Sequence, residues 1–167
     1  AMGELAREPD RSKASGKIHD LNREPAHNID IDDQGKILGA IPFTTLPPTR
    51  EDYEVALQAG GTNSWDAGYL QYAIIDGYQQ LVRDFANWRV VAYGEKHSSG
   101  AKKAWFKADR IRREQILMVD LGYLAHFVGD GSQPLHTSIH YNGWGAYPNP
   151  EGFTTDKIHS PFESAFI

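Results

Sequence analysis

Residues 102–128 read KKAWFKADRIRREQILMVDLGYLAHFV, and this stretch decides the predicted fold. Apolar residues recur in it at helical spacing, which predicts a helix running roughly from Lys102 to Val128. The apolar face of that helix consists of Trp105, Ala108, Ile116, Val119 and Tyr123.

A second helix is predicted upstream, roughly from Trp65 to Val91. Its apolar positions are Leu70, Ile74, Tyr78, Leu81, Phe85 and Trp88. The break between the two helices lies between Gly94 and Gly100, and a break this short predicts an antiparallel helical hairpin. Residues 1–50 are punctuated by prolines and predict irregular structure, with a short strand possible over 28–33. We therefore expect an all-α fold with long loops.

Composition limits what the chain can do. The 167 residues, 40% of them hydrophobic, predict a single domain covering residues 1–167. There are no cysteines, so any metal is held by nitrogen and oxygen. The net charge of −5 argues against a large basic surface for duplex DNA. The opening Ala1-Met2-Gly3 is typical of an expression remnant, so we expect that a native N-terminal segment has been removed.

Histidines gather in the last quarter of the chain, where four of the seven are found. His126 and Asp130 are four residues apart at the end of the helix predicted from Lys102 to Val128, which places them on one face and within reach of one ion. Gly122, one turn earlier, leaves room beside His126. The alternative for such a pair is a hydrogen bond at the helix end.

His136 follows Gln133-Pro134, whose proline stiffens the loop that presents the histidine. His159 and Glu163 repeat the four-residue spacing at the start of a last helix, which is predicted near Ser160-Pro161. The alternative is that His159 and Glu163 form an ordinary pair on the protein surface and bind no metal. The two pairs with a histidine between them favour a metal site. His140 lies four residues after His136 and could be a ligand, but we expect it to bond with solvent. We assign no ligand role to His19 and His97.

These residues carry a family resemblance. The segments His126-Phe127-Val128-Gly129-Asp130 and Gln133-Pro134-Leu135-His136 resemble the signature of the zinc-dependent phospholipase C and fungal single-strand nuclease superfamily. His159-Ser160-Pro161-Phe162-Glu163 resembles its last ligand pair. Pro25 to Asp30 resembles its His-x-Ile-Asp segment, and Glu8 to Arg11 resembles the segment of an earlier aspartate ligand. The resemblance implies a mainly helical domain with zinc ions, in a periplasmic or secreted protein.

The resemblance also implies the ligand sets. Asp10, His27, His126 and Asp130 would hold the first zinc ion, and His136, His159 and Glu163 the second. Asp130 would bridge the first ion to a third, which in the family also takes an N-terminal tryptophan and a histidine soon after it. Here no tryptophan precedes Trp65 and no histidine precedes His19. We therefore expect two tightly bound zinc ions rather than three.

The expected activity is hydrolysis of a phosphodiester. Zinc lowers the pKa of water and neutralises a phosphate. Asp10 could orient or deprotonate the attacking water, and Lys13 or Arg11 could stabilise the phosphate; ordinary solvated cations are the alternative. Glu163 as final ligand resembles the phospholipase C branch, so a phospholipid head group is the first expected substrate.

The long loop before His159 resembles the nuclease branch, with single-stranded nucleic acid as substrate. Its aromatic residues could stack on a base, meet an acyl chain or pack within the loop; they are Tyr141, Trp144, Tyr147 and Phe153. Other interpretations are a zinc-stabilised domain without turnover and a fragment of an active enzyme. No stable protein partner and no transmembrane segment are predicted.

Overall fold

The computed structural model describes residues 2–13 and 23–165, and over these residues the chain is mainly helical. The prediction of an all-α fold is confirmed. The chain separates into two compact units, one formed by Ala1–Asp20 with Ala73–Val128 and the other by Leu21–Tyr72 with Gly129–Ile167. The interpretation of residues 1–167 as one domain stays a prediction.

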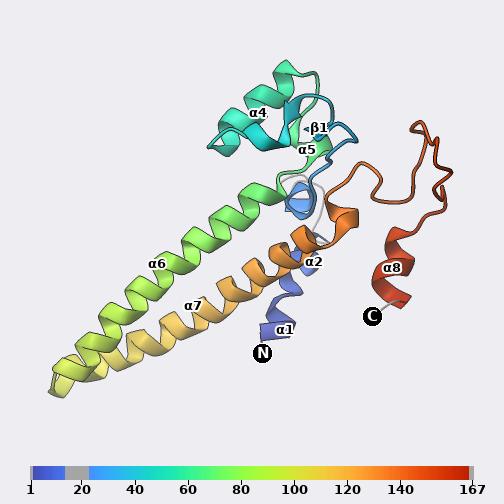
Figure 1. The fold of residues 1–167 in the computed structure, drawn as a ribbon. Helices are drawn as coiled ribbons and strands as arrows, with labels where there is room; N and C mark the ends of the chain where they lie inside the picture. Colours follow the sequence, from blue (N-terminus) through green and yellow to red (C-terminus); the bar gives the residue numbers. More distant parts are fainter. Residues whose placement is uncertain (1, 14–22, 166–167) are drawn as a thin grey trace. The chain divides into compact units, whose positions relative to one another are not determined.

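Two long helices make up most of the first unit. They are α6 (Leu70–His97) and α7 (Gly100–Ser132), which run antiparallel (Figure 1). The predicted hairpin is confirmed, with only Ser98 and Ser99 between the helices. The predicted start at Trp65 was wrong, because Gly68 has a φ of 74° and ends a separate short helix, α5 (Ser64–Ala67).

Polar contacts join the two helices along their shared seam. The Gln80 amide donates to Asp84 at 2.9 Å and to Asp120 at 3.4 Å. The Trp88 indole donates to Glu114 at 3.0 Å. Farther along, the Arg110 guanidinium pairs with Glu95 at 2.7 Å.

The apolar face that predicts each helix is therefore only partly a buried face. Leu81 is buried, but Tyr78 is 62% exposed and Trp105 is 57% exposed. The α6 row also includes exposed Val82 and Phe85 at helical spacing. Polar pairs share the hairpin seam with apolar side chains such as Leu81 and Leu117. The helical period was therefore correctly predicted, and the direction of burial only in part.

Two short helices lie near the N-terminus in the first unit, where irregular structure was expected. They are α1 (Met2–Leu5) and α2 (Glu8–Lys13). A β-carbon at Gly122 of α7 would lie 2.7 Å from the Leu5 carbonyl carbon. Gly122 therefore admits the end of α1 against α7, so the room that the glycine leaves is filled by Leu5.

The second unit is built from short elements. They are η1 (Glu24–His27), β1 (Lys36–Ile37), β2 (Ile41–Pro42), η2 (Phe43–Thr45), α4 (Arg50–Ala59), α5, η3 (Pro134–His136) and α8 (His159–Ala165). Strands β1 and β2 are antiparallel, with Ile37 opposite Ile41. The strand considered for residues 28–33 is present only as two isolated bridges, Ile29 to Gly68 and Ile31 to Ile37.

A small core holds these elements together. Its fully buried large side chains are Tyr53, Ile37, Leu57 and Leu70. The Tyr53 hydroxyl donates to the Gly68 carbonyl at 2.8 Å, and a β-carbon at Gly68 would lie 2.0 Å from the Asn28 carbonyl oxygen. Only glycine permits this approach, which packs the chain after His27 onto α5.

A backbone bond extends this core toward the C-terminal half of the second unit. The Ile29 amide donates to the His136 carbonyl at 2.8 Å. Residues from two distant parts of the sequence are thereby fixed beside each other. Among the described residues, none of the helices combines the length and apolar character that a bilayer crossing requires.

Candidate metal centre

The second unit presents His136 on a short, capped turn. The Gln133 side chain accepts a hydrogen bond from the Leu135 amide at 3.0 Å, and Pro134 occupies the first position of η3. Proline is favoured there because its missing N–H needs no partner and its φ is already set. The Gln133-Pro134 pair therefore fixes the backbone that carries His136, as the sequence predicts.

The ring of His136 is held in one tautomer. Its Nδ1 lies 2.6 Å from the backbone carbonyl oxygen of His27. A carbonyl oxygen can only accept, so Nδ1 must carry the hydrogen. In the neutral ring the Nε2 atom is then left with a lone pair, which is the form that binds a metal.

His159 is held in the same way. Its Nδ1 lies 2.9 Å from the Tyr141 carbonyl oxygen, and its backbone amide donates to the Asn142 side chain at 3.3 Å. His159 is the first residue of α8, and Glu163 lies one turn later on the same helix. The predicted four-residue pair is therefore present.

Both histidines meet one carboxylate oxygen. Glu163 Oε1 lies 2.9 Å from His136 Nε2 and 3.1 Å from His159 Nε2. Two lone pairs and a carboxylate oxygen repel one another unless a cation, either a proton or a metal ion, lies among them. The cluster His136/His159/Glu163 is thus organised to hold a positive charge.

Charge and burial act in opposite directions on Glu163. Partial burial raises the pKa of its carboxyl group, whereas the hydrogen bond from His136 and the charges of His159 and His136, which require a proton on Nε2 of each ring, lower it. The net result is a pKa below the usual range for glutamate. Glu163 is therefore an anion at neutral pH, as a metal ligand requires.

The donor set fits zinc. Two imidazole nitrogens and one glutamate oxygen, with a further position left open, form a known type of catalytic zinc site. The three ligand atoms lie within 4.8 Å of one another. With Zn–N and Zn–O distances of about 2.0–2.1 Å, ligand atoms around a tetrahedral ion are about 3.3 Å apart. The observed 2.9 and 3.1 Å are close to that spacing.

Other predicted ligands form a separate pair in the second unit. His27 is buried at 4% exposure, and its Nδ1 lies 3.0 Å from Asp130 Oδ2. A carboxylate beside Nδ1 is the common way of orienting a ligand histidine so that Nε2 is left for the metal. Asp130 itself lies in α7, four positions after His126.

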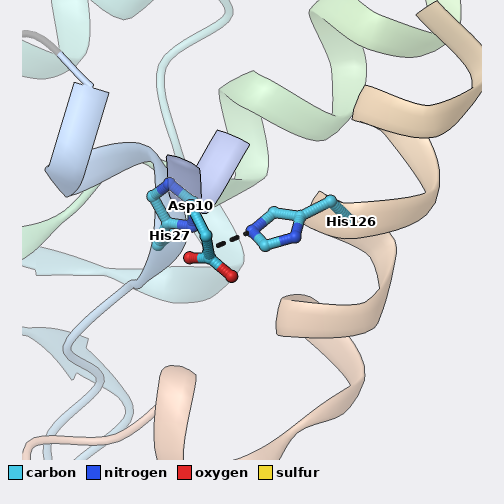
Figure 2. Close-up of side chains that lie close together, drawn as sticks. All are labelled: Asp10, His27 and His126. Carbon is cyan, nitrogen blue, oxygen red and sulfur yellow. Dashed lines mark ion pairs between the residues drawn. The ribbon is translucent and has the colours of Figure 1, made fainter. Parts of the chain in front are cut away.

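The first unit contains another predicted pair. Asp10 of α2 approaches His126 of α7, with 3.8 Å between Asp10 Oδ1 and His126 Nε2 (Figure 2). This distance is too long for a direct hydrogen bond. The assignment of Asp10, His27, His126 and Asp130 to one ion stays a prediction.

The cations proposed for the phosphate are both engaged in ion pairs. The Lys13 ammonium lies 2.9 Å from Asp10 Oδ1. The Arg11 guanidinium pairs with Glu4 and Glu8, and the hydrogen bonds to Glu8 and Glu4 raise its pKa. A phosphate would compete with these carboxylates for either side chain.

His140 differs from the expectation of a solvent contact. Its Nε2 lies 2.9 Å from Asp33, and its ring stacks on Trp144 with 3.7 Å between centroids. His97, which ends α6, contacts the ring of Tyr93. His19 lies outside the described residues.

The contacts that orient the two histidines could not be predicted from the sequence. The carbonyl groups of His27 and Tyr141 set the two tautomers, and Asn142 holds the His159 amide. No residue type marks a carbonyl acceptor, so these positions had no sequence signal. The Gln133 amide also lies 3.4 Å from Glu163, a contact that its place before Pro134 does not indicate.

Comparison of the chain with protein family models, with curated proteins and with solved structures gave no match.

Proposed function

We propose that the chain is a zinc-dependent phosphodiester hydrolase resembling phospholipase C, with His136, His159 and Glu163 as zinc ligands. One observation carries the proposal: two histidine rings, each fixed by a backbone carbonyl, direct Nε2 at the same carboxylate oxygen. Zinc bound there supplies a Lewis acid that polarises a phosphoryl oxygen and lowers the pKa of water.

The protein residues have defined tasks in this proposal. The carbonyls of His27 and Tyr141 keep both rings in the metal-binding tautomer, which removes the cost of reorienting them. Gln133 donates toward Glu163 and helps to hold its carboxylate. The roles expected of Asp10 toward water and of Lys13, its ion-pair partner, toward the phosphate stay predictions, because both residues belong to the first unit and the three zinc ligands to the second.

A domain that binds zinc without turnover is the second candidate. The engagement of Lys13 with Asp10, and of Arg11 with Glu4 and Glu8, favours this interpretation because it leaves both cations neutralised. The open position of a His₂Glu set favours hydrolysis, because structural zinc sites are closed by four protein ligands. A single-strand nuclease or nucleotidase of the same superfamily remains the alternative enzyme.

Zinc binding is tested separately from activity. Anomalous diffraction at the zinc edge should give a peak beside Glu163 in zinc-loaded protein, and His136→Ala should abolish it. His97→Ala, at a histidine outside the cluster, is the control and should retain the peak. No peak in the unaltered protein would overturn the metal site.

Activity is tested with three substrates: a chromogenic phosphodiester, a phosphocholine lipid and single-stranded DNA. We expect zinc-dependent hydrolysis that rises toward neutral pH and is lost in His159→Ala. Turnover of DNA alone would favour the nuclease alternative. A zinc-loaded protein that hydrolyses none of the three would favour the non-catalytic domain.

A further inference from the structure

A cavity of about 790 Å³ lies in the second unit, between the turn at residues 32–38 and the loop at residues 139–153. This volume is in the range of cavities that hold small organic ligands. None of the zinc-ligand candidates lines it. The cavity therefore needs an explanation of its own.

The charged groups of the cavity wall are all acidic. Among the residues that the structure describes, its lining includes Asp32, Asp33 and Glu151 and no lysine or arginine. Asp32 is fixed in place because its carboxylate accepts from the backbone amides of Gln34, Lys36 and Gly39, each at 2.9 Å. The Glu151 side chain is exposed. An anion such as a phosphate would be repelled here, and a cation would be attracted.

Three aromatic side chains, Trp144, Tyr147 and Phe153, form part of the remaining wall. The Trp144 ring contacts two other rings, with centroid distances of 3.7 Å to His140 and 4.7 Å to Phe153. Its indole N–H donates to the Pro148 carbonyl at 2.6 Å. These contacts fix the wall before a ligand arrives, which reduces the entropy lost on binding.

Asn149 fixes the far end of the loop. Its side-chain oxygen accepts from the Phe153 amide at 2.8 Å, and its side-chain nitrogen donates to the Phe153 carbonyl at 2.7 Å. The Trp144 amide donates to the Thr154 carbonyl at 2.8 Å. The aromatic side chains and Glu151 thus line the cavity from an ordered loop, and Asp32 and Asp33 line it from the turn at residues 32–38.

We propose that this cavity binds a small organic cation. Aromatic rings attract cations electrostatically, and nearby carboxylates add to that attraction in a partly desolvated site. Aliphatic and proline side chains complete the wall and contact the apolar part of such a ligand. The proposal requires neither zinc nor hydrolysis.

Three ligands of similar shape and different charge test the proposal: benzylammonium, benzyl alcohol and benzoate. Binding is followed by NMR chemical-shift changes, with the Trp144 indole N–H as the reporter. We expect benzylammonium to bind at least fivefold more tightly than benzyl alcohol, and benzoate to bind most weakly. Equal affinities for the three ligands, an inverted order of affinity, or chemical-shift changes confined to residues outside the cavity would overturn the proposal.

Glu151→Gln supplies the second arm, because it removes one charge from an exposed side chain and retains its shape. It should weaken benzylammonium binding severalfold and leave benzyl alcohol unchanged. Asp156→Asn is the matched control, since Asp156 is an exposed carboxylate outside the lining. An equal loss in both variants would mean that net charge, and not the cavity, attracts the cation.

Discussion

The Nδ1 atom of His136 lies 2.6 Å from the backbone carbonyl oxygen of His27. This contact joins residues far apart in sequence and decides which nitrogen of His136 is left for a metal. The Ile29 amide returns a bond to the His136 carbonyl at 2.8 Å. The two bonds make the His27 segment part of the support for the metal centre.

The tautomers can be measured directly. In zinc-free protein at a pH where both rings are neutral, ¹⁵N NMR should show Nδ1 protonated and Nε2 unprotonated in His136 and His159. Zinc should then shift the Nε2 signals and leave Nδ1 protonated, because the carbonyls of His27 and Tyr141 hold that hydrogen. Coordination through Nδ1 of either ring would contradict the geometry.

Zinc should stabilise the protein through this cluster. A ligand that binds only the native state at 100 times its Kd adds about 2.7 kcal/mol to the free energy of unfolding. His136→Ala should lose most of the zinc-induced rise in Tm, whereas His97→Ala should retain it. Thermal melts with zinc and with chelator make the comparison. If the two variants gave the same zinc-induced rise, His136 would not be a ligand.

The sequence predicted the helices better than it predicted what they bury. The period of Tyr78 and Phe85 was correctly assigned to a helix, yet both side chains are largely exposed. The period depends only on spacing along one segment. Which face is buried depends on the partner helix, and here Gln80, Trp88 and Arg110 form polar bonds across the seam.

In the candidate site, too, the features that depend on local sequence were predicted and those that depend on distant parts of the chain were not. The spacing of His159 and Glu163 and the Gln133-Pro134 turn were visible in the sequence, because each depends on local backbone geometry. The convergence of His136 with Glu163 could be expected only from the resemblance, since it depends on the path of the loop between them. The cavity that Trp144 lines was indicated in the sequence only by a cluster of aromatic residues.

Acidic groups in the hairpin seam predict a stabilising substitution. Burial is the main cause that raises the pKa of Asp120, and the hydrogen bond and negative charge of Asp84 raise it further. The ionised form is therefore disfavoured in the folded protein, and stability falls as pH rises through the range between the ordinary and the raised pKa. Asp120→Asn removes this cost and can still bond with Asp84.

We expect Asp120→Asn to raise Tm at neutral pH and to have no such effect in acid, where both forms are uncharged. Melts of the variant and the unaltered protein at several pH values test this. Asp76→Asn, at an exposed carboxylate of the same helix pair, is the control. A gain that persists undiminished at acidic pH would show that charge is not the cause.

Asp30 gives the last prediction, with a defined pH window. Burial raises the pKa of its carboxyl group from 3.8 to about 6, although a hydrogen bond from Asn28 at 3.0 Å opposes the shift. The folded state then binds a proton more tightly than the unfolded state. Stability due to this group is greatest below pH 3.8, declines as pH rises to about 6, and is constant above that value.

Asp30→Asn keeps an oxygen that can accept from Asn28 and removes the charge. Since each pKa unit corresponds to about 1.4 kcal/mol, the variant should be more stable by at most about 3 kcal/mol above pH 6. The gain should shrink through the window and vanish near pH 4. Urea unfolding of both proteins across this range, with chelator present to exclude metal effects, measures it. A gain of equal size at pH 4 and pH 7 would refute the raised pKa, because it would be independent of ionisation.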